Sequence, residues 1–235
     1  MSSQVPGASP ALRSQGRPLT RASHAYGLVL VLILASLVFQ LAAADRGWAR
    51  LVTIGLQSGT LIVALLVSGV HRWLLRLTLV VVAVAILASA GVLVGSGELG
   101  ETGPRIILLL LVAVVPAAIV VGIVRETRLA GRVTIRTMFG VLCIYLLLGM
   151  VFAFAYGAIA AIDSREFFAS GAAETQSNLV YFSFVTITTT GYGDLTAGTD
   201  LGRSLAVTEA LSGQIYLVTA VALVVGNLAL SRRNA

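Results

Sequence analysis

The chain has 235 residues, of which 57% are hydrophobic and 11% charged, and its mean hydropathy is +0.96. A soluble domain carries about 25% charged residues and could not bury so much apolar surface, so the composition excludes an ordinary soluble protein and indicates a membrane protein. The net charge of +6 comes from Arg alone, because the sequence contains no Lys. Since the Arg residues lie at the ends of apolar runs and not in one basic stripe, the charge does not indicate binding to nucleic acid.

Residues 1–24 are rich in Ser, Pro, Gly, Gln and Arg, and we expect them to form a disordered cytoplasmic tail. Six apolar segments follow, each long enough to cross a hydrocarbon core of about 30 Å as a helix. Helices are expected because only helices and closed barrels satisfy the backbone inside a bilayer. The predicted transmembrane helices are residues 26–44, 51–70, 73–95, 104–124, 137–162 and 204–230.

The first apolar segment also has features of a cleavable signal peptide. Arg13, Arg17 and Arg21 precede it, and the small residues 42–44 end it. Its apolar core is longer than the usual core of a signal peptide, which favours a retained helix. Cleavage would leave the orientation of the later helices unchanged.

The distribution of Arg predicts the orientation of the helices. Cytoplasmic loops of membrane proteins carry an excess of Lys and Arg. Most Arg residues of this chain lie in alternate connections, which places these connections and both termini in the cytoplasm of a multi-pass protein of the cell membrane. They are Arg13, Arg17, Arg21, Arg72, Arg76, Arg125, Arg128, Arg132, Arg136, Arg232 and Arg233.

The connection between the fifth and sixth helices, residues 163–203, is unlike the others. It begins polar, becomes apolar and aromatic, and ends in a Thr-rich run followed by Gly-Tyr-Gly-Asp. This order predicts a re-entrant element, with a pore helix over residues 176–188 and an extended filter over residues 189–193. Non-helical backbone at membrane depth is tolerated only where it is buried in protein or lines a water-filled or ion-filled path.

The filter sequence suits a dehydrated K⁺ ion, which needs a cage of oxygens in place of its water shell. Backbone carbonyls from several strands can supply the cage, and Gly191 and Gly193 permit the dihedrals that aim successive carbonyls at one axis. Thr189 can add its hydroxyl oxygen at the inner end. We expect Tyr192 to point away from the axis and to pack against Tyr181 and Phe182.

The run Thr-Thr-Gly-Tyr-Gly-Asp resembles the Thr-Val-Gly-Tyr-Gly-Asp filter of the pore-loop family of potassium channels. Thr186, three residues before Thr189, and Gly202-Arg203 at the start of the last helix also resemble bacterial members. The resemblance covers about residues 137–230. It implies a homotetramer in the lipid bilayer, in which each chain supplies one filter strand and K⁺ is the transported ion.

The resemblance also implies roles for single residues. The K⁺ sites would be lined by Thr189, Thr190, Gly191, Tyr192 and Gly193. Asp194 would brace the outer mouth through a hydrogen bond with Tyr181. Gly213 falls where the inner helix of the family often has its hinge, although this glycine could instead permit close helix packing. The sequence departs from the family at Thr190, which replaces Val, and at Val185, where some bacterial members have a Glu behind the filter.

Glu209 lies within the predicted sixth helix, and an ionisable group in a membrane span is a functional candidate. We expect Glu209 either to brace the filter from behind through a hydrogen bond with a hydroxyl of the pore loop or to lie at the outer interface. Both placements are favoured over the binding of a cation.

The predicted organisation is a four-helix peripheral membrane domain over residues 25–130 and a pore domain over residues 131–235. A voltage sensor needs several Arg inside the membrane, whereas residues 106–124 contain none, so we expect a channel that is not voltage-gated. The short tail after the sixth helix leaves no room for a cytoplasmic regulatory domain on this chain.

Several function classes can be compared. The sequence has no catalytic pair, phosphate-binding glycine loop or metal cluster, so we expect neither an enzyme nor a cofactor. Transporters usually contain internal repeats, and this chain has a single pore unit, which favours a passive K⁺ channel over the membrane subunit of a K⁺ uptake transporter. A weakly selective cation channel is a further alternative.

Overall fold

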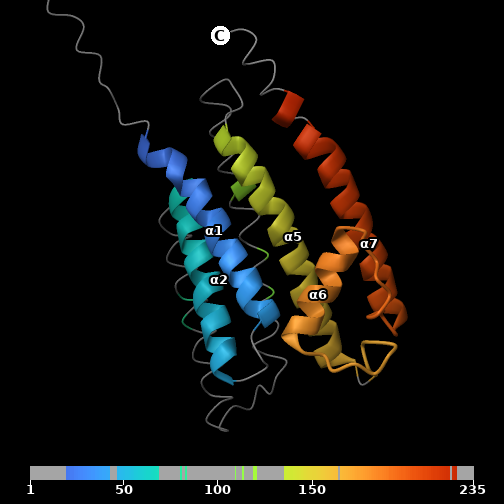
Figure 1. Ribbon diagram of the computed structural model, residues 1–235. Coiled ribbons are helices and arrows are strands. Elements are labelled where there is room, and N and C mark those ends of the chain that lie inside the picture. The colour runs from blue at the N-terminus through green and yellow to red at the C-terminus, as the bar shows by residue number, and fades with distance from the viewer. Residues whose placement is uncertain are drawn as a thin grey trace, which may run out of the picture.

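The computed structural model is a bundle of helices, and its described residues contain no β-strand (Figure 1). The structure describes residues 20–42, 47–68, 135–163, 165–222 and 224–226, together with the single residues 80, 83, 109, 113, 119 and 120. The transmembrane helices predicted over residues 73–95 and 104–124 lie outside the described residues, apart from these single positions.

The helices follow the apolar runs of the sequence closely. They are α1 (Thr20–Ala42), α2 (Gly47–Ser68), α5 (Ile135–Ile162), α6 (Gln176–Ile187), α7 (Asp200–Tyr216) and the π-helical turn η1 (Leu217–Val221). Among the described residues, Thr137–Ile162 and Asp200–Gly226 are long and apolar enough to cross a membrane.

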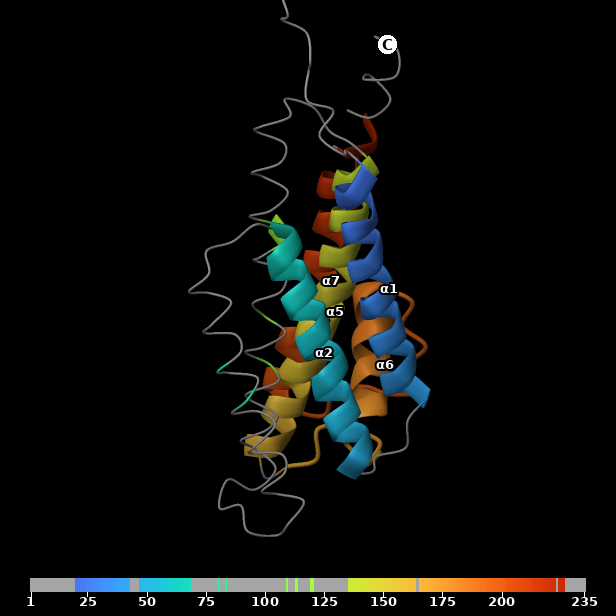
Figure 2. The same cartoon turned by 90° about the vertical axis from the view of Figure 1, so that its left-hand side faces the viewer.

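The long helices lie side by side, with α1 and α2 along one side of α5 and α7 along the other (Figures 1 and 2). The short helix α6 contacts α1, α5 and α7 and lies toward one end of the bundle. The start of α1 and the turn η1 both lie at the opposite end, on different sides of α5 (Figure 1). The connection between α5 and α7 therefore stands at the end of the molecule away from both of these helix ends.

The helices α1, α2, α5 and α7 all begin earlier than the sequence analysis predicts, α2 at Gly47 instead of residue 51 and α5 at Ile135 instead of residue 137. The helix α1 starts at Thr20, inside the segment 1–24 that was expected to be disordered, because Arg and Ala in residues 20–25 are good helix formers and extend the helix past the apolar run. The helix α7 starts at Asp200 and not at residue 204, because the Thr199 hydroxyl accepts a hydrogen bond from Gly202 N at 3.1 Å and caps it.

A stripe of small residues on α5 lets α6 approach closely. Gly149, Ala153 and Gly157 recur every four residues and therefore share one face of the helix, where all three are buried. A Cβ atom at Gly149 would lie 3.1 Å from Phe184 Cζ, and one at Gly157 would lie 3.3 Å from Leu179 Cδ1. Because lipid is as apolar as a side chain, such close packing contributes much of the association between helices in a membrane.

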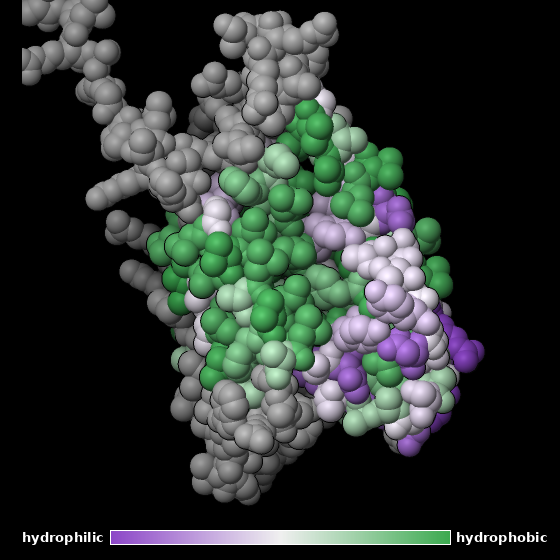
Figure 3. All heavy atoms as spheres, in the orientation of Figure 1, coloured by the Kyte–Doolittle hydropathy of each residue, from purple (hydrophilic) through white to green (hydrophobic). Residues whose placement is uncertain are grey.

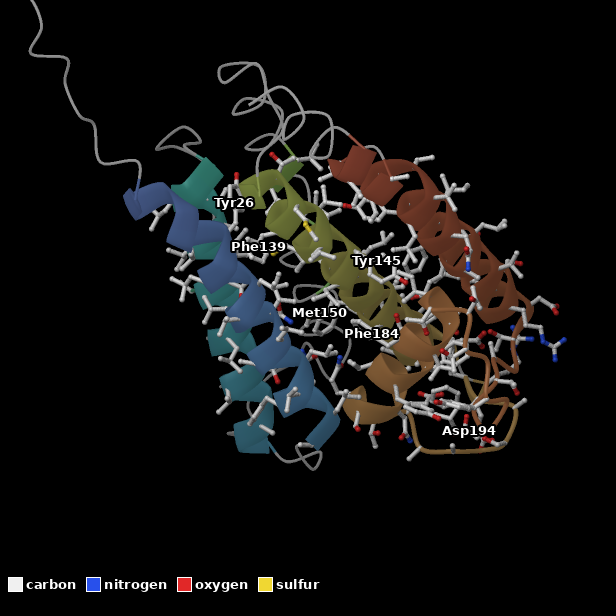
Figure 4. All side chains as sticks on the ribbon, turned by 45° about the horizontal axis from the view of Figure 1, so that its top comes forward. Tyr26, Phe139, Tyr145, Met150, Phe184 and Asp194 are labelled. Atoms are coloured by element: carbon white, nitrogen blue, oxygen red, sulfur yellow. The ribbon has the colours of Figure 1, made fainter. Side chains whose placement is uncertain are left out.

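Two clusters of buried side chains hold the bundle together. One joins α1, α2 and α5 and includes Tyr26 and Met150, with Phe139 and Phe184 packed against it (Figure 4). Hydrophobic side chains cover the helices, whereas hydrophilic ones gather at the end where the connections between α5 and α7 lie (Figure 3). The second cluster lies near that end and consists of Tyr156, Phe167, Phe168, Leu179, Phe182 and Ala197.

The helix α1 also makes polar contacts with the start of α6. Gln176 Nε2 donates to Gln40 Oε1 at 3.2 Å, and Ser177 Oγ donates to Leu41 O at 3.0 Å. The helix α1 is therefore attached to α6 as well as to α5.

The loops before and after α6 are fastened to each other. Phe168 and Ala197 form an isolated antiparallel bridge. Ala169 N donates to Thr196 O at 2.9 Å, and Gly198 N donates to Phe167 O at 2.7 Å. Because the rings of Phe167 and Phe168 are buried against Tyr156 and Phe182, the aromatic cluster anchors both loops at once.

Phe168→Ala should therefore destabilise this end of the protein. Phe168 is 1% exposed, and truncating a buried Phe to Ala costs about 3–5 kcal/mol. The matched control is Ile162→Ala, which changes a side chain that is 70% exposed at the end of α5 and should cost less than about 0.5 kcal/mol. Thermal unfolding of the purified protein measures both, and equal shifts of the two midpoints would contradict the anchoring role.

Candidate functional site

The candidate site begins at the C-terminal end of α6, which carries the extended strand at residues 189–193. The helix starts where the Thr175 hydroxyl accepts a hydrogen bond from Asn178 N at 3.1 Å, and it ends at Ile187 with Thr188 as its cap. The predicted pore helix, residues 176–188, is thus one residue longer than the observed helix. The partial negative charge of the helix C-terminus lies next to the strand and favours a cation there.

The strand has an alternating backbone. Positive φ angles occur at Thr189 (55°), Gly191 (56°) and Gly193 (80°), whereas Thr190 and Tyr192 keep negative values. Glycine adopts a positive φ without a steric penalty, so Gly191 and Gly193 permit this alternation. Thr189 is β-branched and rarely adopts this conformation, which costs on the order of 1–3 kcal/mol and is found mainly at functional sites.

The carbonyl oxygens of the strand are unpaired. The amides of Thr189, Thr190 and Gly191 donate back to the last turn of α6. Within the described part of the chain, the carbonyl oxygens from Thr189 to Gly193 accept no hydrogen bond, and these residues are exposed. The strand therefore presents a row of backbone oxygens that water, a cation or another chain can contact.

The Thr189 hydroxyl, predicted as an oxygen at the inner end of the filter, is already engaged in the single chain. It donates to Thr188 O at 2.7 Å and accepts from Gln214 Nε2 at 3.1 Å. Gln214 therefore links α7 to the inner end of the strand, a contact that the sequence analysis did not predict.

The hydrogen bond predicted between Tyr181 and Asp194 is present, with Tyr181 Oη donating to Asp194 Oδ2 at 2.9 Å. The Tyr181 ring stacks on Tyr192, with the ring centroids 6.5 Å apart and the planes at 8°. The prediction that Tyr192 also packs against Phe182 was wrong, because Phe182 follows Tyr181 by one helical residue, faces a different side and lies in the second cluster.

Glu209 is fully buried behind α6 and does not line the strand. Tyr156 Oη donates to Glu209 Oε2 at 2.5 Å, and Ser183 Oγ lies 2.5 Å from Glu209 Oε1. The carboxyl group thus joins α7 to both α5 and α6. The sequence analysis left two main placements open for Glu209. The contact with the Ser183 hydroxyl on α6 fits a bracing role, whereas the burial of Glu209 does not fit an exposed position at the outer interface.

Gly213 lies directly against the end of α6. A Cβ atom there would lie 2.6 Å from Ile187 Cγ1 and 2.6 Å from Ile187 O. The same carbonyl accepts a hydrogen bond from Tyr145 Oη on α5 at 3.2 Å. Close packing therefore accounts for this glycine, while its role as a hinge stays a prediction.

The sequence analysis did not name four of the side chains that make these contacts, namely Ser183, Gln214, Tyr145 and Tyr156. Each of these side chains is polar and lies within an apolar helix, which is the signal that singled out Glu209. The sequence does not reveal their partners, because the contacts join helices that are far apart along the chain.

Comparison with known families supports an ion channel. Residues 140–229 match a family model described as an ion channel. The match begins in α5, contains α6 and the strand, and extends beyond η1. It covers less than half of the chain. No curated protein and no solved structure matches the chain significantly.

The match supports an ion-channel function for residues 140–229 and indicates a channel protein that is not an enzyme. It agrees with the prediction of a helical membrane protein that conducts ions, and two helices of the described chain are long and apolar enough to cross a membrane. The helices of the matched region frame the exposed residues 189–193.

Gly213→Ala tests whether this glycine serves packing or hinging. An added methyl group would collide with Ile187, and such overpacking costs about 1–3 kcal/mol, so we expect a lower thermal midpoint. Gly226→Ala is the matched control, because nothing lies within 4 Å of its Cβ position. An unchanged midpoint for Gly213→Ala together with slower channel opening would support the hinge and contradict the packing role.

Proposed function

We propose that the chain is one subunit of a homotetrameric, potassium-selective channel that conducts K⁺ passively across the cell membrane. The K⁺ sites are lined by Thr189, Thr190, Gly191, Tyr192 and Gly193. Asp194, Tyr181 and Glu209 support this filter without binding the ion. The re-entrant segment consists of α6 and the filter, between the fifth and sixth of six transmembrane helices.

The observation that carries the proposal is the combination of alternating φ angles and unpaired carbonyls at residues 189–193. Backbone carbonyls replace the hydration shell of K⁺ in channel filters. A row of oxygens that accepts no hydrogen bond from the described chain is suited to that exchange, and an ordinary loop has no need of a strained Thr189.

A single strand cannot surround an ion, which is the argument for four copies. The helix α7 supports this arrangement, because large apolar side chains on it are exposed in the single chain. Several repeat every three or four residues and form a stripe along the helix, where another subunit can pack. They are Val207, Leu211 and Ile215 on α7 and Val218 in η1, which continues α7.

The arrangement of the helices supports an orientation with the filter outside and both termini in the cytoplasm. The start of α1 and the turn η1 lie at one end, away from the connection that carries the filter (Figure 1). With the Arg-rich connections in the cytoplasm, the filter opens to the outside and both termini are cytoplasmic. Because the fourth apolar run contains no Arg, the channel opens without a charge-moving voltage sensor.

Potassium flux from liposomes that contain the purified protein tests the filter. Gly191→Ala should abolish most of the flux, because an L-residue pays about 1–2 kcal/mol per chain at the positive φ of this position. Gly226→Ala, at an open helical position, is the control and should conduct like the wild type. Flux that survives Gly191→Ala would remove the filter assignment.

Selectivity is measured by the reversal potential in opposed K⁺ and Na⁺ gradients. We expect a potential that follows K⁺, because the carbonyl cage replaces the hydration of K⁺ and leaves Na⁺ poorly coordinated. A potential that follows both ions would indicate the weakly selective cation channel instead.

Tyr181→Phe tests the support of the outer mouth. The change keeps the ring that stacks on Tyr192 and removes the donor to Asp194, so we expect the K⁺ current to decay faster during sustained conduction. Asp194→Asn keeps an acceptor oxygen and should behave between Tyr181→Phe and the wild type. Identical current decay in all three proteins would contradict the support role.

A further inference from the structure

The hydroxyl of Ser183 faces two oxygens but carries one hydrogen. Ser183 Oγ lies 2.6 Å from Gly149 O on α5 and 2.5 Å from Glu209 Oε1 on α7. A backbone carbonyl can only accept, and an ionised carboxylate can only accept. If Glu209 were ionised, one of these two short contacts would join two acceptors with no proton between them.

A protonated Glu209 gives every contact one hydrogen. Glu209 Oε1 then donates to Ser183 Oγ, Ser183 Oγ donates to Gly149 O, and Tyr156 Oη donates to Glu209 Oε2. The result is an unbroken chain of hydrogen bonds from α5 through α6 and α7 and back to α5. Such fully satisfied buried networks fix the positions of their members.

The surroundings of Glu209 favour the same protonation state. The Glu209 side chain is 0% exposed. Within the described part of the chain, Arg165 forms an ion pair with Asp163, and Glu209 forms none. Burial of an ionised carboxylate without a cation is very costly.

Within the described part of the chain, no ion pair joins Glu209 to a cation. The titratable side chains that the structure describes on α5 are Cys143, Tyr145 and Tyr156. The helix α6 contributes Ser183 and the phenol of Tyr181, and it has no charged residue. The helix α7 itself carries Asp200 and Arg203 near its start, and Arg203 Nε donates to Ala197 O.

We propose that Glu209 is a neutral carboxylic acid in the conducting channel and that it positions α6 as a hydrogen-bond donor to Ser183. Glu209 is a positioning residue, because it contacts the pore helix and not the ion. The inference rests on the proposed function for its effect on conduction, whereas the protonation state stands on the geometry alone.

Ionisation of Glu209 then acts on the filter through α6. Loss of the proton leaves Ser183 with one hydrogen for two acceptors and puts a charge into a site without a cation. The hydrogen bonds that hold α6 in place are weakened. The position of Thr189, six residues further along the chain from Ser183, is then less well fixed. Conduction is therefore favoured below the pH at which Glu209 ionises and is lost as the pH rises through that value.

The first experiment is an infrared measurement on the full-length protein in liposomes. We expect the carbonyl stretch of a protonated carboxyl group at neutral pH in the wild type, and its absence in the spectrum of Glu209→Gln. A difference spectrum between these proteins that contains only a carboxylate band overturns the proposal.

The second experiment follows K⁺ flux from neutral to alkaline pH. Wild-type flux should fall by about tenfold per pH unit once Glu209 ionises, following the protonated fraction. Glu209→Gln keeps a donor and an acceptor without a titratable proton, so its flux should match the wild type at neutral pH and stay level. Wild-type flux that instead falls on acidification, or a Glu209→Gln profile identical to the wild type, overturns the proposal.

A second variant keeps the test informative if Glu209→Gln does not fold. Tyr156→Phe removes the donor that stabilises the ionised form more than the neutral one, so the fall in flux should move to higher pH. An unchanged profile counts against the proposal. If the wild type carries no K⁺ flux but retains the protonated infrared band, the proposed function fails and the protonation state of Glu209 stands.

Discussion

The position of α6 is the constraint on which the geometry of residues 189–193 depends. Within the described part of the chain, the carbonyl oxygens from Thr189 to Gly193 accept no hydrogen bond, so no ladder of backbone hydrogen bonds with another strand holds this segment in place. Its geometry is set by the helix at one end and by Asp194 at the other, where Tyr181 donates a hydrogen bond. A small shift or rotation of α6 would move every carbonyl of the strand.

Side chains from two neighbouring helices fix α6 along its length. Near its C-terminus, Tyr145 donates to Ile187 O and Gly213 allows α7 to lie against the same residue. At its centre, Ser183 and Glu209 connect it to α5 and α7. The contacts are polar because, within lipid, a buried hydrogen bond distinguishes one helix arrangement from another, whereas apolar surface does so weakly.

The helix α1 takes part in this support. The end of α1 accepts a hydrogen bond from Ser177 at Leu41 O, and its Gln40 accepts one from Gln176 at the first turn of α6. A displacement of α1 would therefore act on α6 directly, without passing through α5. This contact connects α1 mechanically to the segment that follows α6.

The sequence by itself determined the apolar helices, the short helix before the Thr-rich run and the glycines of the strand. These features are local, because hydrophobic length sets a membrane helix and the positive φ at Gly191 and Gly193 requires a residue without Cβ. Only the tertiary structure decided which partners meet. The contacts of Glu209 with Ser183 and Tyr156, and of Gln214 with Thr189, join residues 25 to 53 positions apart. Such pairings depend on the rotation and depth of each helix, which a helix's own sequence leaves open.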